Sequence, residues 1–150
     1  MRVVIQRVSS ASVTIAGRDA GRIERGLLVL VGIEQADTPA DGEWLAQKIS
    51  KLRIFADADG HMNLSVTGIS GGILVISQFT LHASMQKGAR PSFNAAARPD
   101  HARPLYEQFI VQLSTALGRP VATGEFGAYM EVALVNDGPV TLLLDSRFRE

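Results

Sequence analysis

The stretch from Val132 to Leu144, which reads VALVNDGPVTLLL, has an apolar strand pattern on both sides of the dipeptide Gly138-Pro139. Proline cannot donate a hydrogen bond to a sheet ladder, and glycine tolerates backbone angles that are closed to other residues. The pattern therefore predicts a strand interrupted by a stiff backbone of unusual shape, able to present carbonyl oxygens to a ligand in fixed directions. The alternative is an ordinary Asn-Asp-Gly-Pro turn between two strands.

A second unusual segment ends another strand pattern. The apolar run Ile73-Leu74-Val75-Ile76 is followed by Ser77-Gln78-Phe79-Thr80-Leu81, in which three of the first four side chains are polar. Polar groups at the end of a buried strand are typical of a binding site. A catalytic triad is an alternative for the hydroxyls of Ser77 and Thr80, but it needs a base within hydrogen-bond reach. On a strand, His82 would lie about 7 Å along the chain from Thr80.

Four segments together resemble the D-aminoacyl-tRNA deacylases, in the same order and spacing from the first residue to about Ser146. They are MRVVIQRV (residues 1–8), SQFTL (77–81), RPSF (90–93) and NDGPVT (136–141). The resemblance implies a homodimer that hydrolyses the ester bond of D-aminoacyl-tRNA, and of mischarged glycyl-tRNA, to free tRNA and amino acid. This is a chiral proofreading step in translation, and the resemblance implies that it uses no cofactor and no metal.

The resemblance also implies the catalytic residues, which are Ser77, Gln78, Phe79 and Thr80. The ester is activated by a neighbouring hydroxyl, so positioning and oxyanion stabilisation could supply most of the acceleration. Backbone amides around Gln78 and Phe79 are expected to contact the ester, together with the 2′-hydroxyl of the RNA. Thr80 would shape and polarise the same pocket. The alternative is an ordinary threonine on a strand, whose hydroxyl is hydrogen-bonded within the fold.

Substrate-binding roles follow for Asn136, Gly138 and Pro139, and for three residues outside this loop. The Gly138-Pro139 bond is expected to be cis and to enter the active site of the partner subunit, where its rigid backbone excludes an L side chain. Arg7 would orient this loop, or is an ordinary charge at a strand edge. Phe126 and Met130 would line the pocket near the terminal adenosine or the amino acid, or belong to the core.

Composition bounds the class of protein. The chain has 150 residues, of which 46% are hydrophobic and 20% charged, with no cysteine. These values indicate a single globular domain over residues 1–150 without disulfides or thiolate zinc sites. No apolar run reaches the roughly 18 residues of a membrane span, so we expect a cytoplasmic protein. Lys plus Arg equals Asp plus Glu at 15 each, which argues against a duplex-binding module but permits an enzyme that grips the end of an RNA.

The periodicity predicts more strands than helices. One or two strands are expected over residues 3–15, a hairpin turn over 17–21, a return strand near 22–24 and a buried strand over 27–33. Further strands are expected at 64–66, at the segment that delivers residues 77–81 and over most of 121–145. A first helix is expected to begin at Thr38-Pro39, where Thr38 is the N-cap and Pro39 is at N1. A second helix is expected to begin near Pro99-Asp100 and to end at Gly118. The pattern indicates an α+β fold with a curved, barrel-like sheet and two main helices packed outside.

Two rival functions stay open. The first is a related proofreader that removes a small L-amino acid such as alanine, which a trans Gly138-Pro139 bond would favour. The second is a noncatalytic nucleic-acid binding module, which needs a basic face. Before RPSF only Lys87 and Arg90 remain to meet phosphates, which puts tRNA affinity in question. The stretch from Asp57 to Asn63 begins like a calcium loop, but Gly68 stands where a bidentate Glu is required, so a solvated turn is expected.

Overall fold

A computed structural model describes residues 1–149, which form eight strands, two α-helices and one 3-10 helix. In chain order these are β1 (Arg2–Ile15), β2 (Arg18–Ile23), β3 (Gly26–Gly32), α1 (Pro39–Lys51), β4 (Phe55–Ala56), β5 (Met62–Leu64), β6 (Gly72–Ser77), the 3-10 helix η1 (Phe79–His82), α2 (Pro99–Leu117), β7 (Ala122–Thr123) and β8 (Glu131–Asp145). The expected α+β fold is confirmed.

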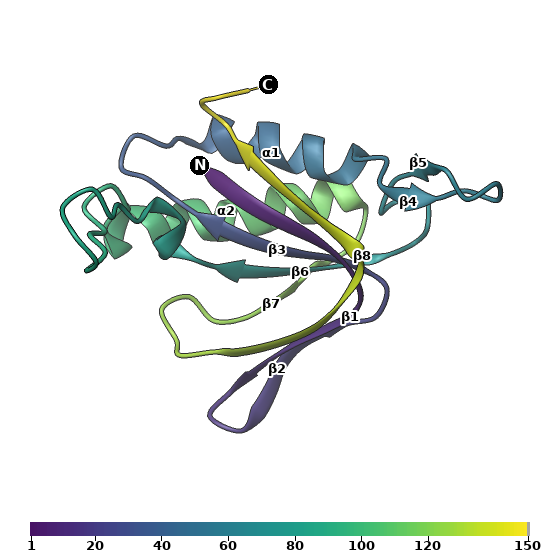
Figure 1. Ribbon diagram of the computed structural model, residues 1–150, viewed down its shortest axis with the longest axis horizontal. Helices are drawn as coiled ribbons and strands as arrows, with labels where there is room; N and C mark the ends of the chain where they lie inside the picture. The colour runs from purple at the N-terminus through teal and green to yellow at the C-terminus, as the bar shows by residue number, and fades with distance from the viewer. Residues whose placement is uncertain (150) are drawn as a thin grey trace.

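Six strands form one strongly curved sheet in the order β2-β1-β3-β6-β7, and β8 pairs with the opposite edge of β1 (Figure 1). The long β1 pairs with β3 through its first half, with β2 through its second half, and with β8 along most of its length. Strands β3, β6 and β7 run parallel to one another. The sheet curls until a Cβ on Gly21 would lie 2.6 Å from the carbonyl oxygen of Thr123. A residue without a side chain thus allows the barrel to close almost completely.

Helices α1 and α2 lie together on one face of the sheet (Figure 1). Their apolar residues pack against the inward side chains of β1, β3 and β6, including Leu45, Ile49, Phe109 and Leu113. A second cluster fills the curl of the sheet on its other face and includes Val8, Val13, Leu28 and Leu74. No helix within residues 1–149 is both long and apolar enough to span a membrane.

The helix boundaries follow the expected signals. Thr38 precedes Pro39 at the start of α1, and the Asp41 carboxylate accepts hydrogen bonds from the Thr38 backbone amide at 2.8 Å and hydroxyl at 3.0 Å. Helix α2 ends at Gly118, whose φ of 82° belongs to the left-handed region that favours glycine. Both ends were predictable because capping depends on local sequence.

Two expectations were wrong in detail. The first hairpin turns at Ala16 and Gly17, both with positive φ, so β2 begins at Arg18 and occupies most of the expected turn. The short strand after the Asp57 turn is residues 62–64 and not 64–66. The expectation that most of residues 121–145 is strand is confirmed, with the strand residues in Ala122–Thr123 and Glu131–Asp145.

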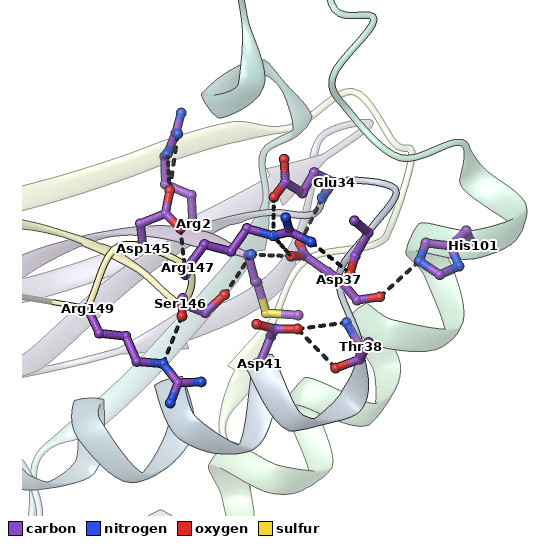
Figure 2. A network of polar contacts seen from close by, with 12 residues as sticks. Arg2, Glu34, Asp37, Thr38, Asp41, His101, Asp145, Ser146, Arg147 and Arg149 are labelled. Carbon is purple, nitrogen blue, oxygen red and sulfur yellow. Dashed lines mark hydrogen bonds and ion pairs between the residues drawn. The ribbon is translucent and has the colours of Figure 1, made fainter.

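A buried polar cluster joins Met1 to the loop before α1 and to the segment after β8; Figure 2 shows Asp37, Ser146 and their neighbours. The α-amino group of Met1 forms an ion pair with Asp37 and donates a hydrogen bond to the Ser146 hydroxyl at 2.9 Å. Asp37 also accepts a bond from the Glu34 amide at 2.8 Å. Arg147 pairs with Glu34 at 2.6 Å, so the cluster fastens β8 and the start of β1 to α1.

Candidate functional site

A cavity of 590 Å³ opens where β3 and β6 end, and we call it the β6-end cavity. Its walls come from the ends of these two strands, the segment that leads into α2, and the loop that leads into β8. The lining residues are Val31, Ile33, Ile76, Ser77, Gln78, Phe79, Phe93, Ala96, Ala97, Arg98, Pro99, Ala102, Phe126, Gly127, Ala128, Tyr129, Met130 and Val132. The parallel pairing of β3 and β6 places both strand ends at the same edge.

The segment after β6 delivers three of the four expected catalytic residues, Ser77, Gln78 and Phe79, to this cavity. The Gln78 backbone amide donates to the Val31 carbonyl at 2.7 Å, so that amide is engaged by the neighbouring strand. The Phe79 amide begins η1 and has no backbone acceptor among residues 1–149. Phe79 is therefore the better placed of the two expected amide donors.

Thr80 does not line the β6-end cavity. Residues 79–82 form η1, so the expectation that Thr80 and His82 share one face of a strand is wrong. Thr80 is exposed, and its hydroxyl accepts a hydrogen bond from the Gln78 side chain at 2.5 Å. The buried Nε2 of His82 has no hydrogen-bond partner among residues 1–149. A hydroxyl–imidazole pair, the first requirement of a triad, is thus not formed here.

An aromatic wall borders the cavity. Phe79 is 57% exposed and meets Phe93 edge to face, with ring centroids 5.0 Å apart. An exposed aromatic pair at the mouth of a cavity offers faces on which a nucleobase can stack. Phe126 and Met130, which the resemblance placed in the pocket, also line this cavity. Phe126 packs on Tyr106 at 5.6 Å.

The remaining expected residues gather elsewhere. Arg7, Asn136, Gly138 and Pro139 lie where the β1–β8 pairing is irregular, and none of them lines the β6-end cavity of the same chain. Arg7 donates to the Asp137 carbonyl at 2.9 Å and to the Ile54 carbonyl at 2.5 Å.

The Asn136 side-chain oxygen accepts from the Val140 amide at 3.3 Å, which closes the same loop from within. The Gly138-Pro139 peptide bond is cis, and the φ of Gly138 is 139°. The structure thus holds two groups of expected residues, one at the cavity and one at the loop.

Tyr106, behind Phe126, is the titratable residue near the cavity with a large pKa shift. Burial raises the pKa of its hydroxyl to about 12. The hydroxyl donates to the Val75 carbonyl at 3.3 Å. The Tyr106 hydroxyl therefore stays protonated at neutral pH and joins α2 to β6 through this hydrogen bond.

Two motifs elsewhere in the chain resemble functional sites. Residues 68–72 read Gly-Ile-Ser-Gly-Gly, the spacing of a nucleophile elbow, but the exposed Ser70 precedes β6 in a turn, whereas an elbow joins a strand to a following helix. Asp57, Asp59 and His61 bring ligand atoms within 4.8 Å of one another. The hydrogen bond from the His61 backbone amide is the main cause that lowers the pKa of the Asp57 carboxyl. Slight burial acts in the opposite direction, and a hydrogen bond from Asn63 lowers the pKa further. That carboxylate therefore caps its own turn.

Sequence reasoning missed one charged residue of the cavity. Arg98 lines it just before Pro99 at the start of α2. The available signal in the sequence was the positive charge of Arg98, because this residue directly precedes the N1 proline of α2 and follows the RPSF segment. Ala97 and Ile33, which are joined by a backbone hydrogen bond of 2.8 Å, also line the cavity and carried no signal, since small and apolar residues occur throughout the chain.

Comparison with known proteins agrees with this architecture. A D-aminoacyl-tRNA deacylase of Opitutus terrae is 64% identical over 150 residues, covering all of both chains. A protein of the same name from Akkermansia muciniphila is 61% identical over the same length.

Two solved structures have the same fold. A c-Myc DNA Unwinding Element Binding Protein superposes with a TM-score of 0.91 at 41% identity, covering 97% of this chain and 98% of that chain. A probable eukaryotic D-amino acid tRNA deacylase superposes at 0.83 with 17% identity, covering 95% of this chain and 97% of that chain. The family described as D-Tyr-tRNA(Tyr) deacylase matches residues 4–145. The chain belongs to this D-Tyr-tRNA(Tyr) deacylase family.

Proposed function

We propose that this protein hydrolyses the ester bond between a D-amino acid and the 3′ end of tRNA, releasing free tRNA and free amino acid. The observation that carries the proposal is the β6-end cavity, into which residues 77–79 are delivered by β6. Membership of the deacylase family and the deacylase names of full-length relatives support it.

The chemistry of the cavity favours substrate-assisted hydrolysis. Of its lining residues only Arg98 and Tyr129 have titratable side chains, and neither is a carboxylate or an imidazole. A general base must lie within hydrogen-bond reach of the proton that it removes. We therefore assign that task to the 2′-hydroxyl of the terminal ribose acting on a water, while the Phe79 amide stabilises the developing oxyanion.

Chiral selection is assigned to the loop of Gly138 and Pro139, acting in the cavity of a partner subunit. This loop does not line the cavity of its own chain, so in this proposal a second copy supplies it. β8 pairs with β1 on one side only, and it exposes Leu134, Val135 and Leu143 to 36%, 57% and 63%. An edge strand with exposed apolar side chains is suited to pairing with another copy.

A rigid backbone beside the α-carbon would exclude an L side chain while admitting hydrogen or a D side chain. Glycyl-tRNA is therefore a second expected substrate. We assign the whole chain to one domain that acts on charged tRNA in the cytoplasm. If the loop left more room, the same site would remove a small L-amino acid, which is the closest rival.

A second candidate function is nucleic-acid binding without catalysis. The 41% identical structural relative is named for binding a DNA element. This candidate predicts salt-sensitive binding to duplex DNA, which depends on positively charged contacts to phosphates. The net charge of the chain is zero, which argues against this candidate.

Purified protein should be mixed with D-tyrosyl-, L-tyrosyl- and glycyl-tRNA in the presence of a chelator, and ester loss followed over time. The deacylase predicts rapid loss of the D-tyrosyl and glycyl esters only. A parallel reaction with L-alanyl-tRNA tests the rival proofreader, which rapid loss of that ester would select. Uncatalysed decay of every ester, with duplex binding that weakens with salt, would select the binding module.

A further inference from the structure

A second cavity adjoins the β6-end cavity. It has a volume of 620 Å³ and lies between α2 and residues 123–126, at the end of β7 and just after it. We call it the α2 cavity. Phe126 lines both cavities. A ligand that extends out of the β6-end cavity therefore meets the α2 cavity on the other side of one aromatic side chain.

The polar groups of the α2 cavity match those of a nucleotide. The guanidinium of Arg103 lies 5.1 Å from the centre of the Phe126 ring. A guanidinium stacked on a ring still directs its N–H groups outward, where they can bind phosphate, and its plane can support a base. Two carboxylates line the cavity, and Glu125 is already paired with Arg18.

The second carboxylate, Glu107, is exposed one helical turn from Arg103 and takes part in no ion pair or hydrogen bond among residues 1–149. An unengaged carboxylate accepts hydrogen bonds from the exocyclic amino group of cytosine, and it repels the carbonyl oxygen that uracil presents at the same position.

The spacing of the two cavities fits one nucleotide step. Ala102 lines the β6-end cavity and Tyr106 lines the α2 cavity, so successive turns of α2 face the two spaces. Four residues of an α-helix span about 6 Å. Stacked bases lie about 3.4 Å apart, so a step of about 6 Å holds two neighbouring nucleotides whose bases are unstacked.

We propose that the α2 cavity binds the nucleotide on the 5′ side of the terminal adenosine, which in tRNA is a cytidine. Arg103, held on the Phe126 ring, contacts the phosphate that joins the two nucleotides, and Glu107 accepts from the cytosine amino group. The proposal rests on the deacylase function, since the terminal adenosine must occupy the β6-end cavity. It makes the end of tRNA, and not the adenosine ester alone, the recognised substrate.

The test uses three small D-tyrosyl esters: those of adenosine, of cytidylyl-adenosine and of uridylyl-adenosine. Rates of ester loss are corrected for uncatalysed hydrolysis. We expect kcat/KM for the cytidylyl-adenosine ester to exceed that for the adenosine ester by about tenfold, and that for the uridylyl-adenosine ester by a similar factor. Equal values for the adenosine and cytidylyl-adenosine esters would overturn the proposal.

Two variants separate the contacts. Arg103→Ala should lower kcat/KM for both dinucleotide esters and leave the adenosine ester unchanged within about twofold. Glu107→Ala should bring the cytidylyl-to-uridylyl preference to about one with no effect on the adenosine ester. Lys51→Ala, at the far end of α1, removes a matched charge and should change none of the three rates. If both cavity variants behave like Lys51→Ala, the assignment of the α2 cavity is wrong.

The outcomes also separate this inference from the function on which it rests. If the adenosine ester and D-tyrosyl-tRNA are both hydrolysed but the added cytidine has no effect, only the α2 cavity is misassigned. If D-tyrosyl-tRNA and all three small esters decay at their uncatalysed rates, the proposed deacylase function fails, and the inference fails with it.

Discussion

Gly138 combines a backbone angle closed to other residues with close neighbours. At its φ of 139°, an added Cβ would lie 2.9 Å from the Val140 amide nitrogen and 3.1 Å from Nη2 of Arg7. We therefore predict that Gly138→Ala destabilises the fold by about 1–3 kcal/mol. It should also displace the guanidinium that fixes this loop and reduce discrimination between D- and L-tyrosyl-tRNA. Urea unfolding and paired ester assays measure the two effects.

Gly60 provides the matched control. Its φ of 83° is also positive, but an added Cβ would meet nothing within 4 Å. Gly60→Ala should cost about 1 kcal/mol, the low end of the range for a non-glycine residue in the left-handed region, with unchanged ester selectivity. If the two alanine variants had the same stability and selectivity, the contacts of Gly138 would have no role in the loop.

The candidate residues were predictable from sequence only by type and by resemblance. Ser77, Gln78 and Phe79 end an apolar run, and the structure brings them together with Phe126. Polarity could not show that Thr80 turns away into η1, because the turn depends on the Gln78 amide being held by Val31 of another strand. Nor could it show that Gly138 lies apart from the cavity, since this depends on the register of β1 and β8.

The N-terminus of α1 makes a prediction about pH. Burial alone would raise the pKa of the Asp41 carboxyl, but hydrogen bonds from Ser146 and Thr38 hold this pKa below its usual value. An aspartate with a lowered folded-state pKa stabilises the fold above its unfolded-state pKa of about 3.9, and this stabilisation is lost as pH falls through the folded-state pKa.

Asp41→Asn should therefore reduce the free energy of unfolding by about 0.5–1 kcal/mol at pH 7, the usual range for a helix cap. The difference between wild type and variant should shrink as the pH is lowered below about 4. Urea midpoints at pH 7, 4 and 3 follow it. A difference that stays constant over this series would show that the carboxylate charge is not what stabilises the start of α1.

Helices were more predictable than the connections between strands. Thr38-Pro39 and Gly118 define helix ends through local hydrogen bonds and φ angles, so a short window of sequence contains the signal. Turn position in the first hairpin depends on the positive φ of Ala16 as well as Gly17. Alanine carries no sequence signal for that conformation, because its Cβ disfavours it.

The buried cluster around Asp37 joins distant parts of the chain. The side chain of Asp37 is fully buried and pairs with the α-amino group of Met1 (Figure 2). Removing one partner of a buried ion pair leaves an uncompensated charge and costs about 3–5 kcal/mol. We predict a loss of this size in the free energy of unfolding for Asp37→Asn, measured by urea denaturation at neutral pH.

Glu34→Gln is the control for this cluster. Its partner Arg147 has a side chain 43% exposed, and solvent-exposed ion pairs are worth about 0–1 kcal/mol. A small effect at Asp37, comparable with that of Glu34→Gln, would show that the cluster does not hold β1, α1 and the end of β8 together.

The curved sheet carries both groups of expected site residues, with the β6-end cavity at one edge and the Gly138-Pro139 loop on β8. In our proposal the loop of one subunit reaches the cavity of a second copy of the chain. The separation of these two features cannot be read from the periodicity of the strands, because it depends on the register of β1 and β8. The partner subunit stays a prediction, which the resemblance to the deacylases supplied.

The most direct test is the ratio of kcat/KM for D-tyrosyl-tRNA to that for L-tyrosyl-tRNA, measured with the same tRNA and purified protein. Our account predicts rapid hydrolysis of the D ester while the L ester decays at its uncatalysed rate. Equal decay of the two esters at the uncatalysed rate would contradict deacylation, and equal catalysed hydrolysis would contradict chiral selection by the Gly138-Pro139 loop.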